Sequence, residues 1–174
     1  MPTITEGNLT FTFPASVQAA KYDAWSFYRN QFQARCSKDN KAVDIVAIAG
    51  NQTAWLIEIK DFRIGGRDRQ KEKRLPLADE IAQKVRDSLA GLVAAKFNAS
   101  VPTEKNFATQ FVNCSEIKII LHIEQPNHTC EVIFNLSDLQ DKLKILLKAI
   151  DPRIKILNIA EMTKYPNQYP WKVK

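Results

Sequence analysis

The stretch "AVDIVAIAGNQTAWLIEIKDF", residues 42–62, decides the fold of this protein. Two apolar runs, 42–49 and 53–62, are joined by "GNQ", which has the glycine and asparagine typical of a turn. This order predicts a β-hairpin. Both runs are apolar at successive positions, so we expect both faces of each strand to be covered, as in the centre of a sheet.

Three charged residues, Asp44, Glu58 and Lys60, interrupt these apolar strands. A buried charge is costly unless it is paired or binds a metal. Residues two apart on a strand share a face, so Glu58 and Lys60 point the same way. If Gly50–Gln52 forms the loop, Asp44 lies opposite Glu58 and joins them, whereas a four-residue loop places Asp44 opposite Ile59 and on the other face.

With the first register, two carboxylates and an ammonium group converge. Carboxylate oxygens of Asp44 and Glu58, with the backbone carbonyl of Ile59, suit Mg²⁺ or Mn²⁺. A metal there polarises a phosphate and lowers the pKa of a bound water, and Lys60 is placed to orient that water or to stabilise developing charge. The alternative is an ordinary ion pair between Asp44 and Lys60 near a strand end.

Asp44, followed by Glu58-Ile59-Lys60 on the next strand, resembles the signature of the PD-(D/E)XK nuclease superfamily. The resemblance covers residues 16–123, and Val43 stands where the signature has proline. It implies a restriction-endonuclease-like three-layer α/β/α core, with a central mixed β-sheet flanked by helices. It also implies that Asp44 and Glu58 bind the metal, that Lys60 is catalytic, and that the protein is a metal-dependent nuclease hydrolysing phosphodiester bonds of DNA.

Three further residues enter through this resemblance. Related nucleases place an acid on the helix before the hairpin, which adds Asp23, and a Gln or Lys on the helix after it, which adds Gln83 and Lys84. A helical wheel puts Lys84 at the edge of the apolar stripe and Gln83 on the far side. The alternative for Lys84 is a surface lysine whose stem covers apolar neighbours.

A basic segment, "RIGGRDRQKEKR" at 63–74, leaves the second strand of the hairpin. It has two acidic and six basic residues, a net charge of +4, and the basic ones are Arg63, Arg67, Arg69, Lys71, Lys73 and Arg74. A cationic loop beside a metal site suits binding of a nucleic-acid backbone, and the alternative is a solvated surface loop.

Other patterns compete with this site. The acid-x-Lys triplets at 39–41 and 116–118 have no second acid on an adjacent apolar strand. Cysteine and histidine are common zinc ligands, and a zinc site could be suggested by four residues: Cys114, His122, His128 and Cys130. Their spacing fits no common zinc signature, so we do not expect zinc.

The remaining chain predicts elements on both sides of the hairpin. Strands are expected at 9–13, 116–123, 130–136 and 153–159, and helices at 16–34, 77–97 and 137–150. Ser137 and Gln140 form a predicted capping box. The tail at 165–174 is aromatic, basic and expected to be irregular.

The bulk properties fit a single domain over residues 1–174 with a net charge of +6, a mild indication of a polyanionic partner. Three sparse cysteines do not indicate a secreted disulfide scaffold. We see no signal peptide or membrane-spanning run, so we expect a soluble, cytoplasmic protein that does not contact a membrane.

Three functions follow from these patterns. The first is the nuclease, and the second is a catalytically inactive nucleic-acid-binding module on the same fold. The third is an assembly protein whose aromatic tail, from Tyr165 to Trp171, docks a partner. The expected partner is nucleic acid, with DNA preferred to RNA, and a homodimer or a partner protein is expected to supply target specificity.

Overall fold

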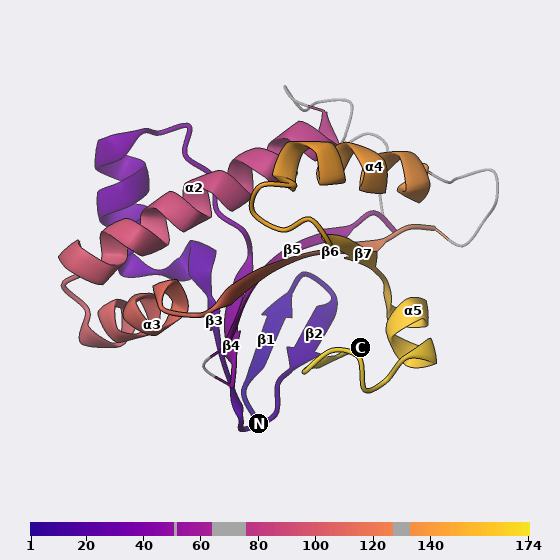
Figure 1. Cartoon of the computed structure of the whole chain (residues 1–174), viewed down its shortest axis with the longest axis horizontal. Coiled ribbons are helices and arrows are strands. Elements are labelled where there is room, and N and C mark those ends of the chain that lie inside the picture. Colours follow the sequence, from indigo (N-terminus) through magenta and orange to yellow (C-terminus); the bar gives the residue numbers. More distant parts are fainter. Residues whose placement is uncertain (51, 64–75, 127–132) are drawn as a thin grey trace.

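A computed structural model describes residues 1–50, 52–63, 76–126 and 133–174. At its centre lies a five-stranded mixed sheet in the order β3-β4-β5-β6-β7 (Figure 1). Its strands are β3 (Val17–Lys21), β4 (Ile45–Ala49), β5 (Thr53–Asp61), β6 (Glu116–Glu124) and β7 (Lys155–Leu157). β3, β4 and β5 pair antiparallel, and β6 and β7 continue parallel to β5.

The predicted hairpin is confirmed, and of the two registers that the sequence left open it has the one with the three-residue loop. Ala49 lies opposite Thr53 and Ile45 lies opposite Ile57, so the connection spans three residues. Gly50 has φ +61, a left-handed conformation that glycine adopts at no steric cost. The odd loop length continues the register to place Asp44, directly before β4, opposite Glu58.

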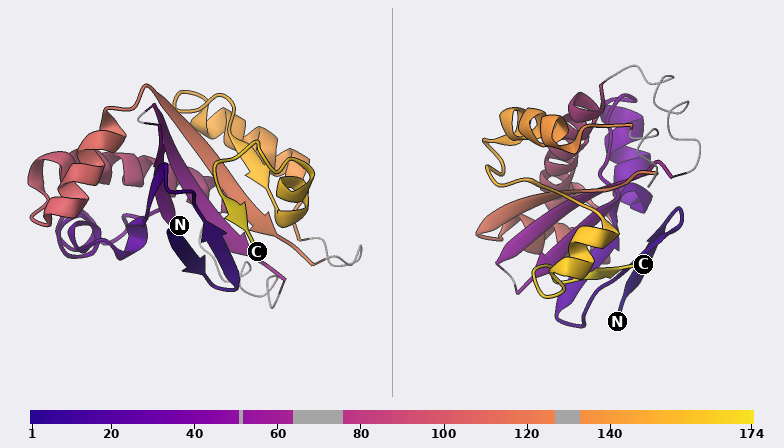
Figure 2. Two further views of the ribbon diagram at one scale, coloured as in Figure 1. Left: turned by 90° about the horizontal axis from the view of Figure 1, so that it is seen from below. Right: turned by 90° about the vertical axis from the view of Figure 1, so that its right-hand side faces the viewer.

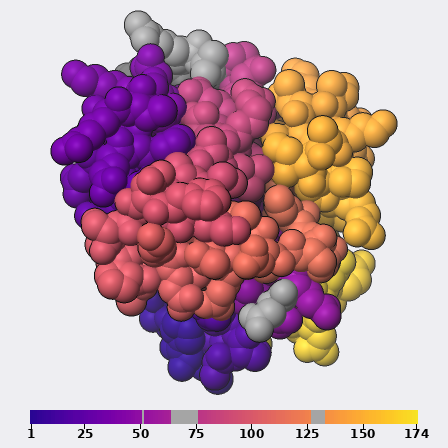
Figure 3. Space-filling model, turned by 60° about the vertical axis from the view of Figure 1, so that its left-hand side comes forward, coloured from indigo at the N-terminus to yellow at the C-terminus, as the bar shows by residue number. Residues whose placement is uncertain are grey.

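Helices cover one face of the sheet. They are α2 (Leu77–Asn98), α3 (Pro102–Val112) and α4 (Leu136–Leu147), and α2 packs against both of the others. Figure 3 shows the pink and orange surfaces of these helices side by side. Ile81 and Val85 of α2 are fully buried in the same core as Leu56 of β5 and Leu121 of β6. The apolar stripe predicted for 77–97 is therefore the stripe that packs on the sheet.

A second, smaller sheet covers the other face. It consists of β1 (Thr3–Glu6), β2 (Leu9–Thr12) and β8 (Lys172–Val173) in the order β1-β2-β8, and α5 (Ile159–Lys164) lies beside it (Figure 2). Phe11 and Trp171 pack there against Trp55 and Ile57 of β5. The chain is thus a mixed α/β protein, but helices flank the central sheet mainly on one side.

The helix predicted at 16–34 is wrong. Its first part forms β3, which pairs with β4 along its whole length, and a 3₁₀ turn, η1 (Tyr22–Ala24), follows. A helix-like segment, η2 (Tyr28–Cys36), comes only after that turn. The local propensity of "VQAAK" favours a helix. The backbone groups at the edge of β4 need hydrogen-bond partners, however, and pairing with them makes this segment a strand.

The start of η2 is capped from a distance. The Glu104 carboxylate of α3 accepts hydrogen bonds from the backbone N–H groups of Ser26, at 2.7 Å, and Phe27, at 3.0 Å. Ser16 does not start a helix. α3 is not among the predicted helices, although Pro102 at its start is typical of a first helical position.

Two predictions around α4 also need correction. In the predicted strand at 130–136, residues 130–132 lie outside the described part, 133–135 are not in a strand, and α4 begins at Leu136. The cap of α4 is Asn135, whose side chain accepts from the N–H of Ser137 at 3.0 Å. Gln140 makes no capping box, because its amide bonds to Ile154 and Ile156 beside β7.

The other strands are confirmed with shifted ends: β2 within 9–13, β6 at 116–124 and β7 within 153–159. The tail is less irregular than predicted, because Lys172 pairs with Thr12 of β2. Trp171, only 3% exposed, is part of the core, so the tail docks on its own chain. No described helix combines the length and the apolar character needed to span a bilayer.

Candidate functional site

The β4–β5 hairpin and α2 together build a buried charged network. Glu58 and Lys60 alternate with the residues that face the small sheet, so they point toward α2, as Leu56 does. On α2, Glu80 and Lys84 are four residues apart and share one face of the helix. Glu58 is fully buried, and Asp44 and Glu80 are 8% and 5% exposed.

Two lysines contact the same oxygen of the Glu58 carboxylate. Glu58 Oε1 lies 2.6 Å from Lys84 Nζ and 2.9 Å from Lys60 Nζ. Lys60 Nζ also lies 3.0 Å from Glu80 Oε1, and Lys84 Nζ lies 3.9 Å from Asp44 Oδ1. The two charged residues of "WLIEIK", Glu58 and Lys60, therefore have ion-pair partners on α2.

Burial and neighbouring charges shift the pKa values of Asp44 and Lys60 in this network for different reasons. Burial raises the pKa of the Asp44 carboxyl to about 8, and the negative charge of Glu58 adds to the shift. Burial lowers the pKa of Lys60, but Glu58 and Glu80 outweigh it and raise the pKa above its usual value. Asp44 Oδ2 accepts a hydrogen bond from the N–H of Ile59 at 2.6 Å. Glu58 Oε2 is buried and accepts no hydrogen bond from the described residues.

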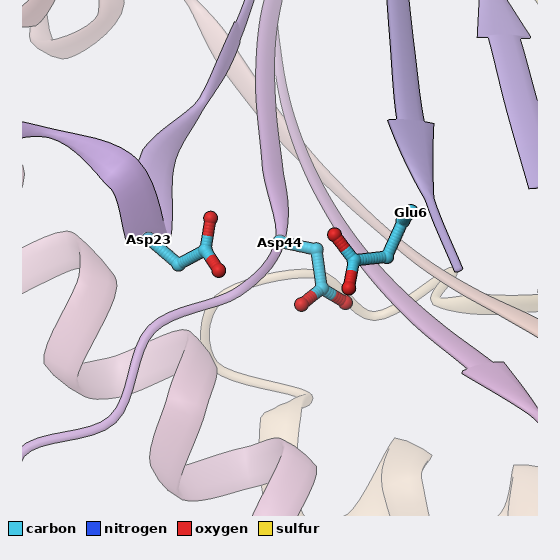
Figure 4. A group of neighbouring side chains, drawn as sticks. All are labelled: Glu6, Asp23 and Asp44. Atoms are coloured by element: carbon cyan, nitrogen blue, oxygen red, sulfur yellow. The ribbon is translucent and has the colours of Figure 1, made fainter.

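Asp44 belongs to a second group of carboxylates. Oxygens of Glu6, Asp23 and Asp44 all lie within 4.8 Å of one another, and the three side chains converge in Figure 4. Glu6 ends β1, and Asp23 lies in η1 rather than on the predicted helix. Lys21 Nζ forms an ion pair with Glu6 Oε2 at 2.6 Å. Glu6 was missed, since no local pattern connects it to the hairpin.

This second group fits a divalent cation. Three carboxylate oxygens this close together can contact one divalent cation, because Mg²⁺ and Ca²⁺ bind oxygen ligands at about 2.0–2.6 Å. In the pair predicted from the sequence, Asp44 and Glu58, the ammonium group of Lys84 already lies against both carboxylates.

The other predicted residues are placed as follows. Gln83 points away from the network and donates to the carbonyl of Asp39 at 2.9 Å. Ile59 meets Asp44 through its N–H, not through the predicted carbonyl. Arg63 pairs with Asp61 at 2.6 Å. Five predicted basic residues lie outside the described part: Arg67, Arg69, Lys71, Lys73 and Arg74.

The competing patterns are structural in the described part of the chain. Glu116 accepts a hydrogen bond from the Thr53 hydroxyl and forms an ion pair with Lys118 at the surface.

His122 is buried, with its Nε2 2.9 Å from Glu124 Oε1. Cys114 precedes β6 and lies on the order of 25 Å along the chain direction from His122. The other two residues of the possible zinc pattern, His128 and Cys130, lie outside the described residues. The expectation that this pattern does not bind zinc therefore stays a prediction.

Comparison with known proteins gives one informative similarity. The chain is 41% identical over 170 aligned residues to a cysteine–tRNA ligase of Neisseria meningitidis serogroup A / serotype 4A. The alignment covers 83% of this chain and 24% of the relative, so the chain spans about a quarter of the length of the curated relative it matches. No protein family matches the chain. No solved structure matches it either.

This similarity overturns the nuclease interpretation. The relative is named as a ligase, not as a nuclease, endonuclease or other hydrolase, so the assignment to the PD-(D/E)XK superfamily and the predicted hydrolysis of DNA are wrong. The physical reason is that a short acid-x-Lys motif has two explanations. Glu58 and Lys60 are also what a buried ion network needs, and α2 supplies its remaining partners.

Proposed function

We propose that this chain is a tRNA-binding module that acts in the attachment of cysteine to tRNA. The observation that carries the proposal is the 41% identity to a cysteine–tRNA ligase. The net charge of +6, with +4 in residues 63–74, supports a polyanionic partner. The partner in this proposal is RNA instead of DNA.

Binding of tRNA tests this proposal. We expect the chain to bind the tRNA that accepts cysteine at least about tenfold more tightly than duplex DNA of equal length at the same salt concentration. Filter binding over a series of salt concentrations gives both the affinity and its salt dependence. Equal affinity for tRNA and DNA would contradict the proposal.

The basic segment supplies a matched pair of variants. Replacing Arg67, Arg69 and Lys71 by alanine is expected to lower the slope of log K against log salt by about 2 to 3, because each phosphate contact contributes about one. The control replaces three exposed lysines of the α4 region, Lys142, Lys144 and Lys148, by alanine. Both variants lose three charges, so an equal loss of slope would show that net charge alone determines binding.

We propose in addition that a divalent cation, Mg²⁺ or Mn²⁺, binds at Asp44. The group that Asp44 forms with Glu6 and Asp23 supports it. The set with Glu58 is the one predicted from the sequence, and there the cation would have to displace the ammonium group of Lys84. When bound, such a cation supplies positive charge to which a phosphate group of RNA binds.

Thermal unfolding tests the cation. An ion at about 100 times its Kd is expected to stabilise the fold by about 2.7 kcal/mol and to raise Tm relative to EDTA. Asp44→Asn is expected to abolish the shift for either ligand set. Glu6→Gln and Glu58→Gln then tell the two sets apart, with Glu161→Gln, an exposed glutamate paired with Lys164, as the control. A shift that survives Asp44→Asn would contradict this site.

For the fold alone, we retain the restriction-endonuclease-like arrangement as a proposal. It is supported by the antiparallel β3-β4-β5 unit, followed through α2 and α3 by the parallel strand β6. A shared fold carries no function by itself. The single domain, the cytoplasmic location and a homodimer or partner protein stay predictions.

A further inference from the structure

A groove lies at the edge of the central sheet that is farthest from β3. It has a volume of about 750 Å³ and adjoins a hollow of about 240 Å³, with which it shares Lys155, Gln168 and Tyr169. Figures 1 and 2 show β7, α5 and the C-terminal segment gathered at this edge. The combined space falls in the range of about 300–1,000 Å³ that is usual for small-molecule sites.

The edge strand in this groove is already capped. β7 has β6 on one side, and on its other side the Gln140 amide accepts from the N–H of Ile156 and donates to the carbonyl of Ile154. One side chain therefore satisfies the backbone groups that an added strand would use. This disfavours an extended peptide that pairs with the sheet edge.

Two tyrosines, Tyr165 and Tyr169, line the groove. Tyr165 is 57% exposed. Tyr169 is half-buried and is held by Trp55, with ring centroids 6.3 Å apart, and by Trp171 at 5.7 Å. Every nucleobase has a π-face that stacks on such a ring, so two tyrosines suit unpaired bases of any sequence.

Basic side chains also line the groove and the hollow. Lys155 is exposed, Lys164 pairs with Glu161 at 2.8 Å, and the hollow adds Lys118 and Arg153. The acidic residue of the hollow, Asp151, is occupied by the backbone N–H groups of Ile119 and Arg153. Aromatic platforms beside cationic side chains are the combination that binds single-stranded nucleic acid.

We propose that this groove binds a single-stranded segment of RNA, with bases on Tyr165 and Tyr169 and phosphates against Lys155 and Lys164. The proposal rests on the proposed function and adds to it where an unpaired part of the tRNA docks. Asn167 and Gln168, which also line the groove, offer amides to base edges.

The experiment uses a fluorescein-labelled oligouridylate of about six nucleotides, within the usual site size. Tyr165→Ala is expected to weaken its binding about 5- to 100-fold, the effect of losing one stacked base. Tyr165→Trp is expected to retain binding, because the ring face is kept. The control is Phe97→Ala, which removes a 65% exposed ring from α2.

The electrostatic part has its own pair of variants. Lys155→Ala is expected to lower the slope of log K against log salt by about 0.7, the value for one contact to single-stranded nucleic acid. Lys148→Ala, an exposed lysine outside the residues that line the groove, is expected to leave the slope unchanged.

Parallel titrations with tRNA separate the two proposals. Oligouridylate binding that both Tyr165→Ala and Lys155→Ala leave unchanged overturns the groove, even if the protein binds tRNA. Oligouridylate binding that falls in both variants, without preference for tRNA over duplex DNA, supports the groove and overturns the tRNA proposal. Binding of a proline-rich peptide in place of the oligonucleotide also overturns the groove assignment.

Discussion

Glu58→Ala is expected to lower the free energy of unfolding by about 3–5 kcal/mol, the usual loss when one partner of a buried ion pair is removed. Glu58 is fully buried and lies within 3 Å of both Lys60 Nζ and Lys84 Nζ. Its removal leaves two lysines, 13% and 16% exposed, without their shared carboxylate. Urea unfolding at pH 7 measures the loss.

The chain offers a close control in the neighbouring strand. Glu116 and Lys118 repeat the Glu-Ile-Lys order on β6 and pair at 3.1 Å, but the Glu116 side chain is 39% exposed. Glu116→Ala is expected to change stability little, because solvent screens such a pair. Equal losses in Glu58→Ala and Glu116→Ala would contradict a structural role of the buried network.

A double substitution separates the charges from the packing. Glu58→Leu with Lys84→Met replaces a buried pair by apolar side chains of similar volume, which is often neutral or stabilising. The double variant is therefore expected to be more stable than Glu58→Ala. A double variant as unstable as Glu58→Ala would show that the packing of this position, not its charge, matters.

Gly91→Ala is expected to destabilise the protein by about 1–3 kcal/mol, the usual cost of overpacking a core. A Cβ atom at Gly91 of α2 would clash with Tyr22 Oη and would lie 3.3 Å from Phe32 Cδ1. In an open helix the same substitution stabilises by about 0.5–1 kcal/mol, so the sign of the effect reports this contact. Thermal or urea unfolding measures it.

Tyr22→Phe is the matched rescue. Tyr22 is fully buried, and its hydroxyl has no hydrogen-bond partner among the described residues. Removing it is expected to be neutral or stabilising by itself and to relieve the clash in the double variant. The two substitutions should therefore be coupled by more than about 0.5 kcal/mol. Additive effects would contradict the close approach of α2 to η1.

Local patterns predicted one part of the structure well. The β4–β5 hairpin follows from two apolar runs joined by "GNQ", a pattern of about twenty residues, and the structure selects the three-residue loop from the two that the pattern allows. The apolar stripe of α2 is local in the same sense. The convergence of Asp44 with Glu58 was therefore predictable as one of two alternatives. Its purpose was not, because a catalytic set and a structural ion network use the same residues.

Predictions from local propensity were wrong where residues distant in the sequence determine the secondary structure. "VQAAK" became β3 because β4 offered an edge, and η2 is capped by Glu104, which lies 78 residues from Ser26. No short-range periodicity records such contacts. The same applies to the tail, where Trp171 is held in the core by Trp55, with ring centroids 5.0 Å apart, and by Phe13.

The sequence by itself determined the hairpin and left two registers, one of which pairs Asp44 with Glu58, because the pleat of a strand and the length of a turn fix which side chains share a face. The structure has that register. Only the tertiary structure decided what surrounds that pair. Lys84 and Glu80 reach it through the packing of α2, and Glu6 and Asp23 reach it from β1 and η1. Burial raises the pKa of Asp44 only once these separate elements exclude water from it.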